Sequence, residues 1–376
     1  MAGIYIHIPF CKHKCNYCNF FSVASVKYRD VFVDALLREM EMRKSYLDGE
    51  TVNTIYFGGG TPSMLTTDEI NRIVKKADVL FNLSSDLEIT LEANPDDINN
   101  NKANDLKNFT SVSRFSIGVQ SFFDDDLQYL DRVHTALEAR QAIELIQKAG
   151  FQNLTIDLIY GIPGLTLDKW HKNLDIFFKY NIPHLSAYSL TVEPKTALQH
   201  QINKQKRAEV DDELSIRHFE ILQKHIKENG FIHYEISNFA KPGFYSKHNS
   251  IYWLGGHYLG LGPSAHSFNG KSRQWNVAAI KKYIESETVD KIVAEKEILT
   301  VKQRFNEYVM TSLRTSWGCD LEHISNVFGS DFATYFTKSI QPFIKEQKVL
   351  QKENSFTLTE KGKLFADGIA AAIFKV

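Results

Sequence analysis

Cys11-Lys-His-Lys-Cys15-Asn-Tyr-Cys18 follows directly on the apolar stretch Gly3-Ile-Tyr-Ile-His-Ile-Pro-Phe10. These spacings place three thiols on one short loop after a strand-like run. Thiolates are soft ligands that select iron-sulfur clusters or zinc. The loop supplies three ligands, so a cluster held here keeps one iron open for a small chelating molecule. A closed zinc site needs a fourth ligand, for which His7 and His13 are the candidates.

The cysteine count also favours a metal. Three of the four cysteines lie within this loop, whereas a disulfide framework spreads its pairs over a small secreted chain. The fourth, Cys319, stands alone in Ser-Trp-Gly-Cys-Asp, and we interpret it as a buried structural residue.

Composition sets the size and the general class of the protein. The chain has 376 residues, of which 43% are hydrophobic, enough for one barrel-sized unit and a smaller domain. The net charge of -1 gives no general attraction to nucleic acid or to anionic membranes. No apolar run is long enough to span a bilayer, and the N-terminus lacks the plan of a secretory signal. The sequence therefore predicts a cytoplasmic protein whose function resides in specific sites.

Outward from the cysteine loop, short β-rich runs alternate with amphipathic stretches as far as residue 200, which is typical of βα units around a parallel sheet. Six units predict an α/β fold, a partial or full barrel, with ligands at the carboxyl ends of the strands. The predicted strands are Ile4–Ile8, Thr54–Phe57, Leu87–Leu91, Arg114–Gly118, Leu154–Ile159 and Leu185–Leu190, and the predicted helices cover 27–46, 67–80, 99–108, 123–131, 135–148 and 167–180.

Two further regions follow this core of residues 1–200. Residues 201–290 are less regular, with a polar helix over 211–229 and then a segment rich in Gly, His, Tyr and Trp. Residues 291–376 predict helices followed by a small hairpin, a mainly helical, winged-helix-like domain. Its basic and acidic residues are nearly equal in number, so nothing supports DNA binding. We interpret this domain as a packing or partner surface.

A glycine run forms the second unusual feature. Tyr56-Phe-Gly-Gly-Gly-Thr61-Pro-Ser carries a predicted strand into three glycines, where backbone can approach a ligand closely. Alone it is an ordinary Gly-rich turn. Because it lies one βα unit after three clustered cysteines, the glycine run is a far more specific sign of a ligand site.

Together these motifs resemble the radical S-adenosylmethionine (SAM) proteins of the oxygen-independent coproporphyrinogen III oxidase-like family. The resemblance runs from residue 4 into the C-terminal domain, and several motifs in order make a chance match improbable. After the cysteine loop and Gly-Gly-Gly-Thr-Pro come Leu91-Glu-Ala-Asn-Pro95, Ser116-Ile-Gly-Val-Gln-Ser121, Arg132-Val-His134 and Asp157-Leu-Ile-Tyr-Gly-Ile-Pro163.

The resemblance implies a radical SAM partial (β/α)6 barrel and a 4Fe-4S cluster on Cys11, Cys15 and Cys18, with SAM chelating the open iron. A carboxylate can accept the ribose hydroxyls, Arg132 can meet the SAM carboxylate, and glycine backbone can lie along the methionyl end. Ordinary structural pairing is the alternative for each of these residues. The SAM contacts implied by motif position are Tyr5, Gly59, Gly60, Thr61, Glu92, Gln120, Arg132 and Asp157.

The family has an oxidase branch, which decarboxylates porphyrinogen propionates. Its cluster loop carries a further cysteine two residues after the third, where this chain has Phe20. It also has a sizeable extension before the cluster, whereas the first predicted strand here starts at about residue 3. Both departures weigh against a decarboxylase.

The other branch is the heme chaperone, HemW type, marked by His-Asn-x-x-Tyr-Trp, which this chain matches as His248-Asn-Ser-Ile-Tyr-Trp253. Histidine is a common axial ligand of heme iron, and the aromatic side chains can stack on the macrocycle. His248 is therefore the predicted heme ligand, ahead of His257 and His266. By itself, a histidine beside aromatics is more often a satisfied core group.

The sequence thus predicts a chaperone that binds heme and transfers it to acceptor hemoproteins, which could include a transient membrane-protein acceptor. The cluster and exchangeable SAM serve this transfer. The alternative is an oxygen-independent coproporphyrinogen III oxidase, which splits SAM into a radical that abstracts a substrate hydrogen. A scaffold for protein partners, built on the C-terminal domain, is a third interpretation that no charge or heptad pattern supports.

Overall fold

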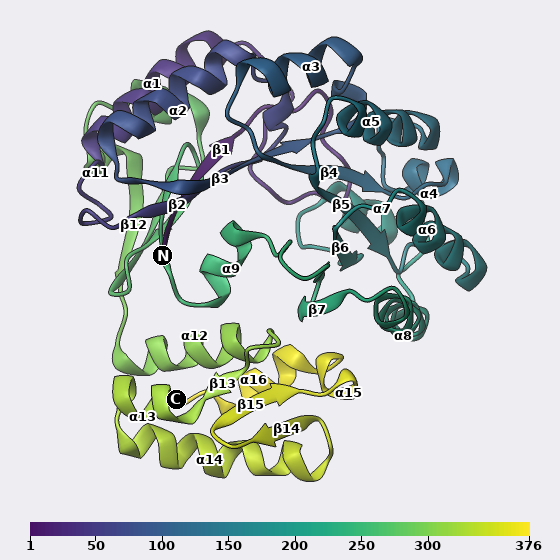
Figure 1. Ribbon diagram of the computed structural model, residues 1–376, viewed down its shortest axis with the longest axis vertical. Coiled ribbons are helices and arrows are strands. Elements are labelled where there is room, and N and C mark those ends of the chain that lie inside the picture. Colours follow the sequence, from purple (N-terminus) through teal and green to yellow (C-terminus); the bar gives the residue numbers. More distant parts are fainter.

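The computed structural model describes residues 1–376, and its main feature is one curved sheet of twelve strands. Six consecutive strands at its centre run parallel. Figure 1 shows them curving around a central space with helices on the outer face, while the first and the sixth strand stay unpaired with each other. These strands are β1 (Ala2–Ile8), β2 (Val52–Gly59), β3 (Leu83–Ala93), β4 (Arg114–Gln120), β5 (Asn153–Tyr160) and β6 (His184–Ser189).

The outer helices follow the strands as the βα pattern predicts. Their apolar faces join a single hydrophobic core with the strands. β1, β4 and β5 are buried along nearly their whole length, as parallel strands covered on both faces are. Thr66 and Thr135 each begin a helix with a capping box. The helices are α1 (Arg29–Met42), α2 (Thr67–Leu80), α3 (Asn100–Phe109), α4 (Asp124–Tyr129), α5 (Ala136–Lys148) and α6 (Leu167–Lys179).

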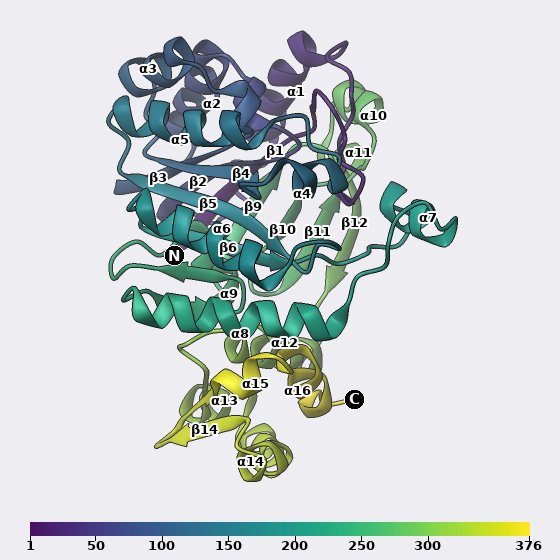
Figure 2. The same ribbon diagram turned by 90° about the vertical axis from the view of Figure 1, so that its right-hand side faces the viewer.

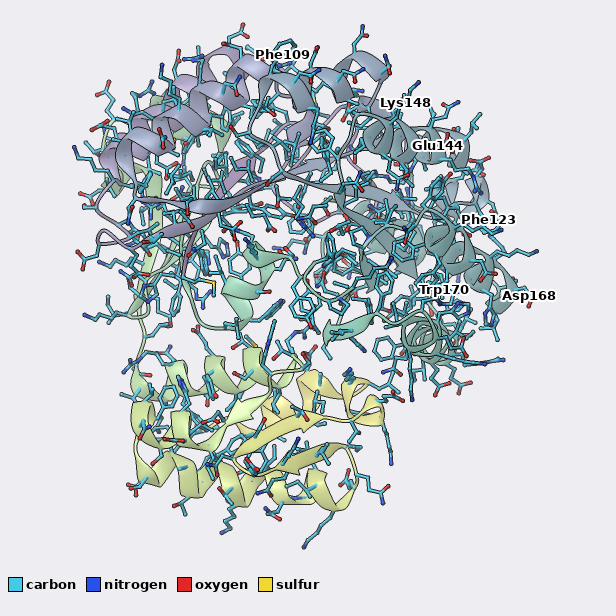
Figure 3. The ribbon with its side chains drawn as sticks, in the orientation of Figure 1. Phe109, Phe123, Glu144, Lys148, Asp168 and Trp170 are labelled. Carbon is cyan, nitrogen blue, oxygen red and sulfur yellow. The ribbon has the colours of Figure 1, made fainter.

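Tryptophan anchors the last of these helices. Figure 3 shows Trp170 on the inner side of α6 and Asp168 at its outer edge. The Trp170 indole N–H donates to the carbonyl of His218, 2.8 Å away on α8 (Asp212–Glu228), so its one polar atom is satisfied on burial. The predicted α/β barrel is confirmed. It is a partial barrel, because β1 and β6 do not pair with each other.

The region over 191–298 is more regular than its sequence indicates. It adds β9, parallel to β1, and then three antiparallel strands on one side of the sheet, with two antiparallel strands on the other. These strands have three to six residues, too short for a clear alternating pattern. The elements are α7 (Ala197–Asn203), β7 (Ile232–Glu235), β8 (Asn238–Ala240), α9 (Lys247–Trp253), β9 (His257–Leu261), β10 (His266–Phe268), β11 (Ser272–Asn276), α10 (Ile280–Glu285), α11 (Val289–Ile292) and β12 (Val293–Ile298).

A buried ion pair ties this added sheet to the first helix. Glu39 accepts from Arg43 at 3.1 Å, from Asn276 at 2.8 Å and from the Tyr283 hydroxyl at 2.7 Å. Its other partner is the backbone N–H of Gly262, at 2.8 Å. A buried carboxylate is tolerated only when it is paired and fully hydrogen-bonded, as this one is. The network fixes β9 and β11 against α1.

The C-terminal domain has its own hydrophobic core, separate from that of the barrel. Cys319 lies fully buried within it, which confirms the interpretation of this cysteine as structural. The domain is mainly helical, with a three-stranded antiparallel sheet. Its elements are α12 (Val301–Leu313), β13 (Cys319–Asp320), α13 (Leu321–Phe328), α14 (Ser330–Lys345), β14 (Val349–Lys352), β15 (Ser355–Leu358), α15 (Glu360–Lys363) and α16 (Ala366–Ile373).

The two cores meet around one short helix. Figures 1 and 2 show α9 between the strands of the barrel and α12 of the C-terminal domain, and α9 contacts both. At the same junction Arg314 forms an ion pair of 3.2 Å with Glu235, and the Ser316 N–H donates to the carbonyl of Tyr234 at 3.0 Å. None of the helices is both long and apolar enough to cross a bilayer.

Candidate functional site

A cavity of about 400 Å³ opens at the carboxyl ends of the parallel strands. This is the edge where α/β sheets place their ligands. Seven of the eight predicted SAM residues line it: Gly59, Gly60, Thr61, Glu92, Gln120, Arg132 and Asp157. Cys18 of the cysteine loop lines it too. The fold therefore gathers, in one cavity, motifs that are spread over a hundred residues of sequence.

Tyr5 lies behind this cavity instead of in its wall. Its ring stacks on Tyr56 with centroids 6.1 Å apart, and its hydroxyl hydrogen-bonds to Nδ1 of His7 at 3.2 Å. These contacts support the wall from inside the barrel, so a SAM contact by Tyr5 stays a prediction.

Two half-buried carboxylates, Glu92 and Asp157, face the cavity. Burial, reinforced by the charge of Asp157, raises the pKa of Glu92 to about 7, although the Tyr56 hydroxyl donates to this carboxylate at 2.7 Å. Burial likewise raises the pKa of Asp157 to about 6, and Ser116 donates to it at 3.2 Å. Two such groups in one cavity are typical of a functional site, because their ionised forms lack a full set of partners.

Arg132 connects the cavity with the cysteine loop. One guanidinium nitrogen lies 3.4 Å from Sγ of Cys15, and another donates to Asn94 at 2.8 Å and to the carbonyl of Gly118 at 2.9 Å. Its Nε is buried and has no hydrogen-bond partner. A buried donor without a partner is costly, so this cation fits an anionic group bound beside the loop.

The cysteine loop is held by its backbone. The Cys11 N–H donates to the carbonyl of Val23 at 3.1 Å, and the Asn16 side chain donates to the carbonyl of Tyr129 at 2.8 Å. All three thiols are free and half-buried. Burial, followed by the neighbouring charges of Cys15 and Cys11, raises the pKa of the Cys18 thiol. Three thiols that influence one another fit a shared metal cluster, whose positive charge favours thiolates.

The two candidate fourth ligands of a zinc site are both hydrogen-bonded through Nε2. Nε2 of His7 is hydrogen-bonded to the carbonyl of Phe21 at 2.8 Å, and Nε2 of His13 pairs with Asp131 at 2.9 Å. No group of three His, Cys, Asp or Glu side chains is arranged to hold a single metal ion. The iron-sulfur interpretation, in which the protein supplies three ligands, requires neither histidine.

The glycine run is required by the loop itself. A Cβ on Gly60 would lie 2.6 Å from the carbonyl oxygen of Phe10 and 3.0 Å from Sγ of Cys11. Gly59 has φ +107, and a Cβ there would lie 2.7 Å from the His7 ring. The glycines thus let the cysteine loop pack directly on the end of β2.

His248 lies inside the barrel, on α9. It is 1% exposed, and both ring nitrogens have partners, with Thr54 Oγ1 2.7 Å from Nδ1 and the Tyr252 hydroxyl 2.8 Å from Nε2. Its ring stacks on Tyr56 with centroids 4.9 Å apart. Burial lowers the pKa of His248 to about 3, so the ring is neutral at physiological pH. Iron ligation by His248 would require α9 to leave β2.

The other histidines of this region are less enclosed. Nδ1 of His257 pairs with Glu50, and His266 is exposed with its ring edge toward Trp275. Neither contacts the cavity of the barrel.

The motif Tyr234–Phe239 acquires a role that sequence reasoning did not assign. The Tyr234 hydroxyl bonds Nε2 of the buried His184 at 2.8 Å, and Glu235 pairs with Arg314. The motif therefore joins the two domains, and no local pattern in the sequence indicates this partner.

Sequence reasoning also missed a second cavity, of about 430 Å³, between the barrel and the C-terminal domain. Tyr252 and Trp253 line it from α9, Tyr258 and Phe268 from the added sheet, and α12 and α13 from the other side. Of these elements, only α9 contains a recognisable sequence motif, His-Asn-x-x-Tyr-Trp. Because the wall is shared by two domains, neither domain's sequence pattern outlines it.

Comparison with known proteins defines the class. The Radical SAM superfamily model matches residues 5–176, and the HemN C-terminal domain model matches residues 299–365. Coproporphyrinogen III oxidase (HemN) from Escherichia coli, a radical SAM enzyme, shares the fold with a TM-score of 0.85 and 24% identity, over 100% of this chain and 90% of that one.

Curated relatives are more specific. The heme chaperone HemW of Bacillus subtilis (strain 168) is 32% identical, over 99% of this chain and 99% of its own length. HemW of Escherichia coli (strain K12) is 36% identical, over 70% of this chain and 69% of its own. The chain belongs to the HemW family of radical SAM proteins.

Proposed function

We propose that this protein is a heme chaperone of the cytoplasm, which binds heme and passes it to acceptor hemoproteins. It carries a 4Fe-4S cluster on Cys11, Cys15 and Cys18 and binds exchangeable SAM. The relatives named heme chaperone, matched over nearly the full chain, support the heme role. The cavity lined by Cys18, Arg132 and two carboxylates supports the cofactors, and Arg132 also contacts Cys15.

The chain's residues have distinct tasks at that cavity. A cluster held by Cys11, Cys15 and Cys18 would leave one iron open, which SAM would chelate through its amino and carboxylate groups. Arg132 meets the carboxylate, since its Nε lacks a partner and its guanidinium already contacts Cys15. Glu92 and Asp157 accept the ribose hydroxyls, which favours their ionised forms. Gly59 and Gly60 bring bare backbone beside the methionyl end.

Phe20 distinguishes the chaperone from the oxidase interpretation. Its side chain lines the same cavity and is 64% exposed, at the position where the oxidase branch has its additional cysteine. An exposed phenylalanine supplies no thiol for metal or redox chemistry. The oxygen-independent coproporphyrinogen III oxidase is therefore the second candidate, supported by the shared fold with HemN.

The two candidates separate in one preparation. The cluster is reconstituted anaerobically, and the protein is then titrated with hemin and, separately, supplied with coproporphyrinogen III, SAM and a reductant. A chaperone gives a Soret band that saturates with hemin and forms no protoporphyrinogen IX. Product formed over multiple turnovers by a protein that does not bind heme would reverse the assignment.

A further inference from the structure

The cavity between the two domains is chemically unlike the cavity of the barrel. Six of its sixteen lining residues are tyrosine, tryptophan or phenylalanine, from α9 and the added sheet on one side and from α12 and α13 on the other. We propose that heme binds in this cavity, with His323 as the ligand of its iron. The inference rests on the proposed heme function and assigns its site.

The size and the walls suit a flat apolar ring. A volume of about 430 Å³ lies within the range of cofactor sites. The Tyr252 and Tyr258 rings meet edge to face with centroids 4.6 Å apart, and Tyr258 packs on Phe268. Across the cavity Tyr308 packs on Phe328. A porphyrin between these walls would bury both of its faces against aromatic carbon, the largest favourable contribution available here.

His323 is the histidine in this wall, and its ring is available. It stacks on Tyr308 with centroids 4.5 Å apart and an interplanar angle of 23°, and neither ring nitrogen has a hydrogen-bond partner. The start of α13 holds its position, since the Asp320 carboxylate accepts from the His323 N–H at 2.7 Å. Imidazole nitrogen is a common axial ligand of heme iron. His248, by contrast, uses both nitrogens inside the barrel.

The charge of the cavity matches the propionates of heme. Arg304 lines it without any ion pair or side-chain hydrogen bond, and Arg273 lines it while paired with Glu307 at 3.0 Å. Two guanidinium groups therefore face one carboxylate. A further donor is Nε1 of Trp253, which is buried without a partner. Guanidinium is well suited to carboxylate, and an unpaired one is the most available.

This site gives the His-Asn-x-x-Tyr-Trp motif a physical role. Tyr252 and Trp253 form part of the cavity wall, while His248 holds the Tyr252 hydroxyl from behind at 2.8 Å. His248 is then a positioning residue, and the iron ligand comes from the C-terminal domain. Heme would bridge the two domains, with one face against each.

Hemin titration of the full-length protein tests this, with absorption spectra and affinity as readouts. We expect His323→Ala to remove the spectral signature of imidazole ligation and to weaken hemin binding by about tenfold or more. Free imidazole added to this variant should restore the signature. His200→Ala, at an exposed histidine on α7 outside the cavity, is the matched control. Because His323 is exposed, its substitution should leave the fold intact, as circular dichroism would verify.

Arg304→Ala adds an independent readout, because heme dimethyl ester lacks the propionate charges. This variant should lose several-fold affinity for hemin and none for the ester. If wild-type protein binds no hemin, the proposed function fails. If wild type binds hemin and His323→Ala matches His200→Ala while His248→Ala loses the signature, the inference is overturned and the heme function stands.

Discussion

The two cavities of this protein are nearly equal in volume, about 400 and 430 Å³, and differ in the groups that line them. The cavity of the barrel brings together the Cys18 thiol, an arginine and two carboxylates whose pKa values are raised by burial. The interdomain cavity has aromatic walls and an unpaired arginine. In a parallel sheet the carboxyl ends of the strands lie at one edge, so backbone groups and charged side chains gather there. Two domains packed together instead leave apolar surface between them.

A short series of contacts lies between the cavities. Glu92 accepts from Tyr56, whose ring stacks on His248, and His248 bonds Tyr252 in the wall of the second cavity. The motif histidine is thus placed between the two sites. Substitutions at either end can show whether the cavities act separately.

The largest effect is expected at the cysteine loop. Cys11→Ala, Cys15→Ala or Cys18→Ala should each abolish the bound iron and its broad visible absorption, because a cluster with two protein ligands is not retained. Iron content and absorption after anaerobic reconstitution measure this. Hemin binding should persist if the cavities are separate.

Cys319→Ala is the matched control, since this thiol is buried in the C-terminal core and should leave the cluster intact. Equal loss of iron in this variant would disprove the three-ligand assignment. Loss of hemin binding with the cluster would break the separation of the two cavities.

The barrel and most of its cavity could be predicted from sequence because each βα unit is local. Every predicted strand from Ile4–Ile8 to Leu185–Leu190 overlaps an observed parallel strand, and polar residues at strand ends meet once the strands pair. Tyr5 and His248 show where this reasoning stops. Both occur in motifs, yet whether a strand or helix turns a side chain toward the ligand or into the core depends on packing between distant segments.

The next largest effect concerns SAM and pH. Because burial raises the pKa of Glu92 to about 7, the neutral form prevails below that pH, while ribose hydroxyls donate best to the ionised form. SAM affinity should therefore rise between pH 6 and pH 8. The protein without SAM should lose stability as pH rises from about 4.5 to about 7, because over that range the folded state still holds the Glu92 proton that the unfolded chain has released.

Glu92→Gln should weaken SAM binding by about tenfold, the loss of a charge-assisted hydrogen bond, and remove the rise near pH 7. Asp157→Asn should keep that rise, because Asp157 has a pKa of about 6 and so loses its proton at a lower pH than Glu92 does. Calorimetric titration with SAM at three pH values measures both variants. An unchanged pH profile in Glu92→Gln would exclude Glu92 as the group that titrates.

A smaller effect is expected at the domain junction. Arg314→Met leaves the buried Glu235 without its ion-pair partner and should lower the free energy of unfolding by about 2 kcal/mol, less than for a fully buried pair because Arg314 is partly exposed. Urea unfolding measures this. The Arg314 guanidinium also lies 5.4 Å from the centre of the Trp253 ring. The hemin affinity of Arg314→Met should therefore fall several-fold, while its SAM affinity should be unchanged.

Asp367→Asn is the control on the same arginine. It removes the other ion pair of Arg314, whose carboxylate side chain is largely exposed, and should change stability by less than about 0.5 kcal/mol. If Arg314→Met weakened SAM and hemin binding equally, the junction would act on the whole barrel and not on the interdomain cavity.

The interdomain cavity could not have been predicted in the same way. His323 and Arg304 belong to ordinary amphipathic helices, and only docking of α12 on α9 places them opposite Trp253. The sequence carries the apolar periodicity that builds each core, while the relative placement of the two cores depends on pairs such as Glu235 and Arg314, 79 residues apart.

The smallest effect is expected from Tyr252→Phe, which removes one hydroxyl and keeps the aromatic wall. Nε2 of His248 then loses its partner inside the barrel, which should cost about 1 kcal/mol of stability in urea unfolding. Hemin affinity should fall by no more than about twofold, because only the hydrogen bond to His248 is lost and the ring proposed to contact the porphyrin is kept. Tyr258→Phe, which loses a hydrogen bond from Arg273 in the same cavity, is the matched control. If Tyr252→Phe instead lost hemin binding and its imidazole signature while Tyr258→Phe kept both, the orientation of His248 would govern the iron directly. The heme would then belong to the inner side of α9, and the two cavities would form one site.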